Sequence, residues 1–237
     1  MEELLFDRIR MKISDAQFRV STDSMVLADF CRIRPGGRVL DLGCGCGTLG
    51  LLLLGADETL RVSGIEIQEA AARQAQENAE ENGFSAHMHI ICGDLRQAHA
   101  QIAPGTFDYV LSNPPYYPLK SGYLHAQDSL CAARSEICCP LDALCAAAAR
   151  ALRWGGRFFL VHKPERLVDL LTGLRAARLE PKRIRFVRHR AETAVNLVLI
   201  ESRLGGGPGL QYEPDLILYT LTGDLSAEGR RIYHLQE

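Results

Sequence analysis

The chain has 237 residues, 47% of them hydrophobic and 24% charged, and its formal net charge is −2. Such a composition is ordinary for a globular protein, and the length suits one α/β domain. The chain contains no apolar run near the roughly 20 residues of a membrane helix, and its amino terminus lacks the basic and apolar regions of a signal peptide. A charge so close to zero gives no global attraction to polyanions, so contact with nucleic acid requires a local patch. We therefore expect a cytoplasmic protein without a membrane anchor, and we favour a monomer.

Strand and helix patterns alternate along most of the chain. In chain order, the predicted elements are a helix at 24–31, a strand at 38–42, a helix at 48–54, a strand at 61–66, a helix at 68–82, strands at 87–92 and 107–112, a helix at 141–152, a strand at 157–162, a helix at 164–177, and strands at 183–188 and 194–202. Repeated β-α-β units require parallel strands with helices on both faces, whereas the short polar linker between the last two strands fits a hairpin. We predict an α/β fold: a Rossmann-like, doubly wound, mostly parallel seven-stranded sheet with an antiparallel strand near the carboxyl-terminal end.

The chain divides into three expected parts. Residues 1–35 form an N-terminal extension of short strands and a helix, which Ser21, Thr22 or Asp23 would cap. Residues 36–204 form the α/β domain, in which Gly155-Gly156 is expected to stop the helix at 141–152. Residues 205–237, which begin with a glycine-rich run, form a C-terminal tail that we expect to pack on the domain.

Eight cysteines need an interpretation. None belongs to a C-x-x-C pair, and none lies at finger-like spacing from paired histidines. Structural zinc ligands usually come in spaced pairs on turns, whereas free cysteine packs as a small apolar residue. We therefore predict reduced thiols and no bound metal. A zinc site built from Cys131, Cys138 and Cys139 is the alternative.

A glycine-rich turn follows the strand at 38–42. Gly43, Gly45 and Gly47 alternate with other residues before a helix begins, so the backbone can turn tightly and approach a ligand at the carboxyl ends of the strands. Residues 45–50 also match the dinucleotide pattern G-x-G-x-x-G, with Glu66 placed to bind a ribose hydroxyl, but that pattern alone is weak. Asp41 would repel a pyrophosphate and attract the ammonium of a methionine moiety.

The order D-x-G-x-G-x-G, beginning at Asp41, resembles motif I of class I methyltransferases. That resemblance implies S-adenosyl-L-methionine as the cofactor. It also implies that Glu66 accepts from the ribose hydroxyls, that Ile67 packs on the adenine ring, and that Asp94 accepts from the adenine amino group. The expected cofactor-binding residues are Asp41, Gly43, Gly45, Gly47, Glu66, Ile67, Asp94, Leu95 and Asn113.

The run Asn113-Pro114-Pro115-Tyr116 directly follows the strand at 107–112. It resembles the N-P-P-Y motif of methyltransferases that act on planar amino nitrogens, and these four are the expected catalytic residues. An amino group conjugated with an aromatic ring is a poor nucleophile, because its lone pair is delocalised. Acceptors at the Asn113 side-chain oxygen and the Pro114 carbonyl would favour a pyramidal nitrogen aimed at the methyl group. The prolines stiffen the loop, and Tyr116 offers a stacking face to an extruded base.

The N-P-P-Y motif is shared by adenine-N6, guanine-N2 and glutamine-N5 methyltransferases, so its flanks decide between substrates. Residues 18–30, 113–117, 133–136, 162–167 and 181–185 together resemble the tRNA(Val) adenine-N6 methyltransferases. This resemblance covers nearly the whole chain and implies an anticodon-loop adenine of tRNA as the substrate. Two departures are Cys46, where threonine is usual, and Ser135, where histidine is expected; the second puts the role of Arg134 in doubt.

A basic stretch near the carboxyl terminus supports an RNA substrate. Its expected RNA-binding residues are Lys182, Arg183, Arg185, Arg188 and Arg190. Strand alternation would turn Ile184 and Phe186 toward the core and Arg183 and Arg185 outward. An ordinary charged edge strand is the alternative. Arg8, Arg10, Lys12 and Arg19 in the extension could form a second contact surface, and a solvated charged face is an equally good interpretation of them.

Two further functions remain open. A glutamine-N5 methyltransferase has the same chemistry, but that family usually carries a helical N-terminal domain, for which 35 residues leave no room. A Rossmann dinucleotide-binding oxidoreductase, or a catalytically silent nucleotide-binding module, would share the glycine-rich turn. The sequence favours a tRNA adenine-N6 methyltransferase over these alternatives.

Overall fold

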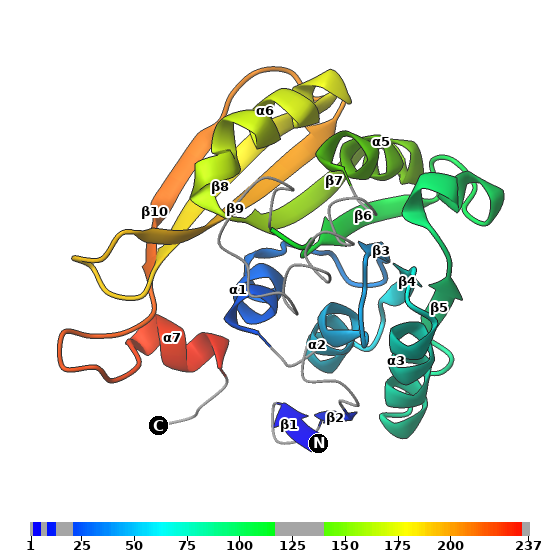
Figure 1. Cartoon of the computed structure of the whole chain (residues 1–237), viewed down its shortest axis with the longest axis horizontal. Helices are drawn as coiled ribbons and strands as arrows, with labels where there is room; N and C mark the ends of the chain where they lie inside the picture. Colours follow the sequence, from blue (N-terminus) through cyan, green and yellow to red (C-terminus); the bar gives the residue numbers. More distant parts are fainter. Residues whose placement is uncertain (1, 6–8, 13–20, 117–139, 234–237) are drawn as a thin grey trace, which may run out of the picture.

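A computed structural model describes residues 2–5, 9–12, 21–116 and 140–233 of the chain. They form an eight-stranded sheet, with helices on both faces and a separate two-stranded hairpin below (Figure 1). The strands of the large sheet are β3 (Arg38–Leu42), β4 (Arg61–Glu66), β5 (Met88–Cys92), β6 (Phe107–Ser112), β7 (Leu152–His162), β8 (Leu179–Arg188), β9 (Val195–Leu204) and β10 (Gln211–Ile217). The hairpin pairs β1 (Glu2–Leu5) with β2 (Ile9–Lys12) in antiparallel fashion.

The strand order of the large sheet is β10-β8-β9-β7-β6-β3-β4-β5. Neighbouring strands are parallel except at β9, which runs antiparallel to both β7 and β8. The predicted mostly parallel, doubly wound sheet with an antiparallel strand late in the chain is therefore confirmed. One strand was not predicted: β10, from the tail, pairs in parallel with β8 and extends the seven expected strands to eight.

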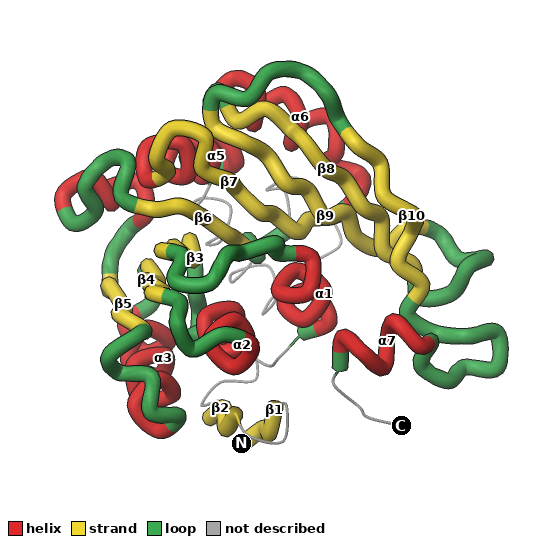
Figure 2. The backbone as a smooth tube through the Cα atoms, turned by 180° about the vertical axis from the view of Figure 1, so that it is seen from behind, coloured by secondary structure: helices red, strands yellow, loops and turns green. Residues whose placement is uncertain are grey.

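Two layers of helices cover this sheet (Figures 1 and 2). One face is packed by α1 (Thr22–Phe30), α2 (Thr48–Ala56), α3 (Glu69–Glu81) and α7 (Ala227–Ile232), and the other by α5 (Leu141–Ala151) and α6 (Leu167–Ala176). Short 3₁₀ helices occupy Leu95–Ala100 and Pro164–Arg166. No helix in the described part of the chain combines the length and the apolar character that crossing a membrane requires.

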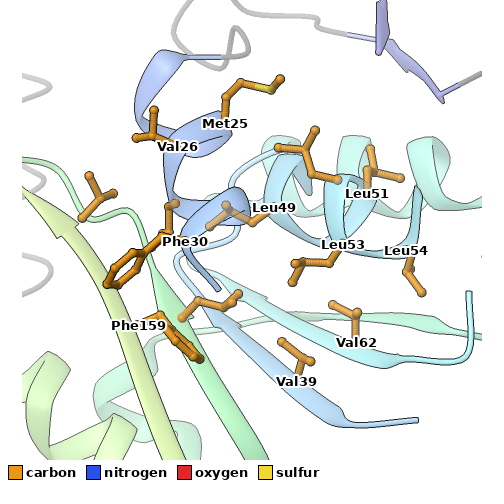
Figure 3. Close-up of a cluster of buried hydrophobic side chains, with 14 of the residues drawn as sticks. Met25, Val26, Phe30, Val39, Leu49, Leu51, Leu53, Leu54, Val62 and Phe159 are labelled. Atoms are coloured by element: carbon orange, nitrogen blue, oxygen red, sulfur yellow. The ribbon is translucent and has the colours of Figure 1, made fainter. Parts of the chain in front are cut away.

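The first core lies between the sheet and the helices α1 and α2 (Figure 3). Its centre holds Val39 of β3, Leu51 and Leu54 of α2 and Phe159 of β7, none of which retains measurable exposure. Phe30, in the last position of α1, meets Phe159 edge to face with ring centroids 6.3 Å apart. The N-terminal extension thus contributes directly to the main core, since its helix α1 covers the sheet.

The start of β7 differs from the prediction. The helix α5 stops at Ala151, one residue before its predicted end, but β7 begins at once with Leu152 rather than at residue 157, so Gly155-Gly156 does not follow the helix as a stop signal. These glycines lie inside β7, near the point where its register against β6 shifts. Gly155 adopts a φ of 77°, and a Cβ on Gly156 would lie 2.9 Å from the Arg153 carbonyl oxygen. The two glycines therefore allow an irregular backbone near the start of β7, and they do not end the helix.

An ion network is buried where α1 meets β8, and it corrects one expectation. Arg183 does not point outward: it is 5% exposed and lies on the face that α1 covers. Its guanidinium donates to Glu201 Oε2 at 2.8 Å, to Glu213 Oε1 at 3.1 Å and to the Phe30 carbonyl at 2.6 Å. Arg157 also binds Glu201, at 2.7 Å. Arg183 therefore joins the extension, the sheet and the tail strand β10.

The substitution Arg183→Ala should destabilise the protein strongly. It leaves the carboxylate of Glu201, which is 5% exposed, without its buried partner. Removing one member of a buried pair typically costs about 3–5 kcal/mol, because the remaining charge stays desolvated. Urea unfolding of wild type and variant measures the difference.

Arg175→Ala is the control, since the Arg175 side chain is 66% exposed in its pair with Glu180. An exposed pair contributes roughly 0–1 kcal/mol. Similar losses in the two variants would contradict a buried network at Arg183.

Candidate active site

The ends of four parallel strands bring the sequence motifs together. β3 pairs in parallel with β4 and with β6, and β4 with β5, so all four strands reach the same edge of the sheet. The glycine turn follows β3, Glu66 closes β4, Asp94 follows β5, and Asn113 follows β6. The Ser112 hydroxyl donates to the Leu42 carbonyl at 2.7 Å, which fixes the end of β6 beside the end of β3. The predicted cofactor and catalytic residues therefore share one edge.

The glycine turn adopts the backbone conformation that its sequence suggested. Gly43, Gly45 and Gly47 have φ values of 77°, 54° and 86°, in the left-handed region that L-residues with side chains rarely adopt. Backbone amides of Gly43 and Cys44 donate to the Ile65 carbonyl at 2.9 and 3.1 Å. A Cβ added to Gly43 would meet no described atom within 4 Å, so a ligand can approach the backbone there.

Glu66 holds this turn from the neighbouring strand. One carboxylate oxygen accepts from the Gly45 amide at 3.0 Å and the other from the Gln68 amide at 2.9 Å. The side chain is only 6% exposed. Because each oxygen carries a second lone pair, the carboxylate can still accept from a ligand hydroxyl. Glu66 thus organises the turn in addition to the ligand contact that the sequence suggested.

Asp41 is the unusual group at this edge. It is 1% exposed, and its Oδ1 has no hydrogen-bond partner among the described residues. Burial, together with the charge of Glu66, raises the pKa of Asp41 to about 8. A buried acceptor without a partner is costly, and a cation bound beside it would satisfy it and favour the ionised form. The unpartnered oxygen of Asp41 is therefore a suitable acceptor for the ammonium of S-adenosylmethionine.

The residues expected to contact the adenosine differ in exposure and in the hydrogen bonds that they already make. Ile67 is 44% exposed, which leaves an apolar side chain at the sheet edge for an aromatic ring. Leu95 is half-buried. Asp94 accepts from the backbone amide of Arg96 at 2.9 Å and from its Nε at 2.8 Å, and these bonds lower the pKa of Asp94. An adenine amino group would share Asp94 with Arg96.

The side chains of the N-P-P-Y loop have a defined orientation. Asn113 Nδ2 donates to the Ser24 hydroxyl of α1 at 3.1 Å, and Asn113 Oδ1 accepts from the Tyr116 hydroxyl at 2.6 Å. The amino end of the amide therefore faces α1 and its oxygen faces the loop. Pro114 is buried and Pro115 is exposed. Asn113 presents an acceptor at the edge where the cofactor turn ends.

Two residues at the end of β7 complete the wall around Tyr116. The His162 ring lies 5.1 Å from the Tyr116 ring, and Lys163 Nζ lies 5.3 Å from its centroid. Burial lowers the pKa of His162 to about 4, so this histidine is neutral. Its Nδ1 accepts from the Lys163 amide at 2.8 Å, which leaves the proton on Nε2.

Sequence reasoning assigned no role to Ser24, His162 or Lys163. The predicted strand order could have identified His162, because it ends β7, which runs parallel to β6 and therefore reaches the same edge of the sheet. Other expectations lie outside the described residues: Arg134, Ser135, the alternative zinc ligands Cys131, Cys138 and Cys139, and the basic residues Arg8 and Arg19. In the described part of the chain, no cluster of three metal-ligating side chains occurs.

The five basic residues of β8 and its turn do not form one open patch. Besides the buried Arg183, Arg185 pairs with Glu228 at 2.7 Å and Arg188 with Asp215 at 2.6 Å. Lys182, near the start of β8, donates to the Gly207 carbonyl at 3.0 Å. Arg190 alone among the five is exposed, in the turn after β8. Because β8 runs parallel to β7 and β6, this turn lies at the edge that carries Asn113.

Comparison with known proteins agrees with this geometry. Residues 16–171 match the family described as methyltransferase small domain. The chain is 32% identical, over 96% of its length and 91% of the relative's, to a tRNA1(Val) (adenine(37)-N6)-methyltransferase of Porphyromonas gingivalis. It is 33% identical, over 79% of its length and 74% of the relative's, to the protein of the same name in Dickeya chrysanthemi.

Solved structures share the fold at lower identity. A predicted O-methyltransferase of Agrobacterium tumefaciens superposes with a TM-score of 0.75 at 19% identity, over 90% of this chain and 96% of that one. A geranyl diphosphate C-methyltransferase of Streptomyces coelicolor, crystallised with S-adenosyl-L-homocysteine, gives a TM-score of 0.56 at 14% identity, over 76% of each chain. Both show the class I methyltransferase fold.

Asp41→Asn should change how the stability of the ligand-free protein depends on pH. The pKa of Asp41 is about 8 in the folded chain, against an ordinary value of 3.8. Between these values the unfolded chain releases a proton that the folded chain keeps, so stability falls as pH rises through this window. Asparagine cannot titrate. The free energy of unfolding of the variant, relative to wild type, should rise by up to about 1.4 kcal/mol per pH unit.

Urea unfolding at pH 4, 6 and 8 measures this difference. Asp57→Asn is the control, because hydrogen bonds from Thr59 lower the pKa of the exposed Asp57 carboxyl. That control should not show the rise. A constant difference between wild type and Asp41→Asn would mean that Asp41 is ionised when the site is empty.

Proposed function

The chain belongs to the family of the tRNA1(Val) (adenine(37)-N6)-methyltransferases, and we propose that it methylates the exocyclic N6 of an adenine in the anticodon loop of a valine tRNA. The observation that carries this proposal is the fixed Asn113 amide, whose oxygen faces the loop beside the cofactor turn. The chain also aligns over 96% of its length with a relative of that name. The name of the relative supports an RNA substrate, and the geometry supports attack by a planar amino nitrogen.

S-adenosylmethionine, when bound, supplies an electrophilic methyl group on a sulfonium. The chain's own residues orient the nucleophile. Asn113 Oδ1 and the Pro114 carbonyl accept from the two hydrogens of the amino group, which weakens conjugation of its lone pair with the ring. Ser24 occupies the amino end of the Asn113 amide, so the amide presents its oxygen rather than its nitrogen to the substrate. No covalent enzyme intermediate is needed, and alignment supplies much of the rate.

Tyr116 already binds the acceptor that we propose for the substrate. Its hydroxyl occupies Asn113 Oδ1 at 2.6 Å, at the acceptor that the target amine requires. The carbonyl oxygen has two lone pairs, so the amine can share it or displace the hydroxyl. The neutral ring of His162, at the end of β7, packs against the Tyr116 ring, and the ammonium of the next residue, Lys163, lies over that ring. This aromatic wall is suited to stacking an extruded base.

We propose that Arg190, rather than the whole basic stretch, contributes an RNA contact. It is exposed in the turn after β8, at the edge of the sheet that holds Asn113. Among the described residues no carboxylate pairs with it, whereas Arg183, Arg185 and Arg188 are neutralised within the protein. Paired cations attract phosphate weakly, because their charge is already compensated.

Asn113→Ala should lower kcat strongly, while the affinity for S-adenosylmethionine changes little. It removes one of two acceptors for the amine, and loss of such a group typically lowers kcat by about 10²-fold or more. The assay incubates the enzyme with a valine tRNA transcript and measures N6-methyladenosine by mass spectrometry of the nucleosides. Calorimetry gives the cofactor affinity.

The matched substrate control replaces adenine 37 of the transcript with guanine. Methylation of this control at guanine, or methylation of release factor but not of tRNA, would contradict the adenine assignment. Full activity of Asn113→Ala would contradict the role of its side-chain oxygen.

Arg190→Ala should raise the Kd for tRNA several-fold. It should also make the slope of log K against log salt concentration shallower by about one, because one counterion fewer is released on binding. Lys182→Ala should leave both unchanged, because Lys182 binds Gly207 near the opposite end of β8. Filter binding across a range of salt concentrations measures both quantities. Equal losses in the two variants would instead support the continuous patch that the sequence suggested.

A further inference from the structure

Asn78, on α3, is a fully buried polar side chain that the methyl-transfer chemistry does not use. It has no measurable exposure. Its Nδ2 donates to the Cys46 carbonyl at 3.0 Å and to the Lys12 carbonyl at 3.1 Å, and its Oδ1 accepts from the Lys12 amide at 2.9 Å. One amide thus joins the N-terminal hairpin to the glycine turn.

A second asparagine, one helical turn later, binds the same hairpin but not the turn. Asn82 Oδ1 accepts from the Arg10 amide at 2.8 Å, and its Nδ2 donates to the Arg10 and Asn78 carbonyls at 2.6 and 2.7 Å. Residues four apart on a helix and two apart on a strand have similar spacing, so the two amides hold β2 as a neighbouring strand would. Of these two asparagines, Asn78 is the one that also hydrogen-bonds to Cys46.

The glycine turn is anchored from two sides. On the β4 side Glu66 accepts from the Gly45 amide at 3.0 Å. On the α3 side Asn78 binds the next residue, Cys46, and a Cβ on Gly47 would lie 3.3 Å from the Cβ of Ala75. Consecutive residues are therefore held by side chains from different elements.

The hairpin also touches the residue that follows the turn. The Thr48 hydroxyl donates to the sulfur of Met11 at 3.5 Å, and both residues are buried. Ile9 and Met11 of β2 belong to the core beneath α2. The position of β2 is thus linked to the conformation of the turn at two places, through Asn78 at Cys46 and directly at Thr48.

We propose that Asn78 is a positioning residue that holds the glycine turn in its S-adenosylmethionine-binding conformation, and that the N-terminal hairpin acts on cofactor affinity through it. A glycine-rich backbone has many accessible conformations, so a turn without anchors spends only part of its time in the competent one. Apparent affinity falls by that fraction. The proposal rests on the turn being the S-adenosylmethionine site, and wild-type binding tests that premise separately.

Calorimetric titration with S-adenosylmethionine tests the proposal on three full-length variants. Asn78→Ala and Asn78→Asp should each raise the Kd by roughly tenfold, the effect of losing about one buried hydrogen bond. Aspartate keeps the acceptor for the Lys12 amide and loses the bonds to the Cys46 and Lys12 carbonyls, so it breaks the link to the turn while one bond to the hairpin remains. Asn82→Ala should lower the thermal stability and raise the Kd by no more than about threefold, because it loosens the hairpin but leaves the bond from Asn78 to Cys46 in place.

Hydrogen exchange gives a second readout that a purely structural role would not move. If Asn78 couples the two sites, cofactor binding must stabilise the hairpin by the same coupling energy. Saturating cofactor should therefore slow exchange of the Lys12 amide in wild type and not in Asn78→Asp.

Three outcomes overturn the proposal: a folded Asn78→Asp with wild-type affinity, an Asn82→Ala that weakens binding as much as Asn78→Ala, or Lys12 protection that does not respond to the cofactor. Failure of the wild type to bind S-adenosylmethionine would instead overturn the assignment of the site.

Discussion

The parallel pairing of β3 with β4 on one side and β6 on the other is the constraint on which the site depends. Because these strands run in the same direction, their carboxyl ends meet at one edge although the chain between them crosses the sheet. The glycine turn, the carboxylate of Glu66 and the acceptor of Asn113 thereby come together. The bond from the Ser112 hydroxyl to the Leu42 carbonyl fixes their relative height. A shift of β6 by one residue would turn Asn113 away from the glycine turn.

At this edge, buried polar side chains mainly hold backbone. Glu66 binds two amides, and Asn78 binds two carbonyls and an amide. Buried polar groups whose hydrogen bonds are satisfied make a site more rigid. Asp41 is the exception, with an oxygen that no described residue binds. Such an oxygen is costly to bury, and this cost is consistent with the proposed binding of a cationic cofactor beside Asp41.

The segments on either side of the α/β domain are integral to it. From the extension, the Ser24 hydroxyl of α1 accepts from the Asn113 amide, and the Phe30 carbonyl accepts from Arg183. From the tail, β10 extends the sheet, and α7 joins α1 through the pairs Arg231–Asp29 and Tyr233–Thr22. The matched family region ends at residue 171, so β8, β9, β10 and α7 lie beyond it. The extension and the tail meet on the face that α1 covers, next to the catalytic loop.

The sequence by itself determined the order and type of most elements, and it located the glycine turn and the N-P-P-Y loop. These features are encoded locally, by periodicity and by glycine or proline at fixed positions. Only the tertiary structure decided which distant side chains meet. Ser24 lies 89 residues from Asn113, and Asn78 lies 66 residues from Lys12, so no local pattern pairs them. Alternation along β8 likewise placed Arg183 and Arg185 on one face, but not the helix that covers it. Because α1 packs there, a cation that appeared free for RNA is instead the centre of a buried ion network.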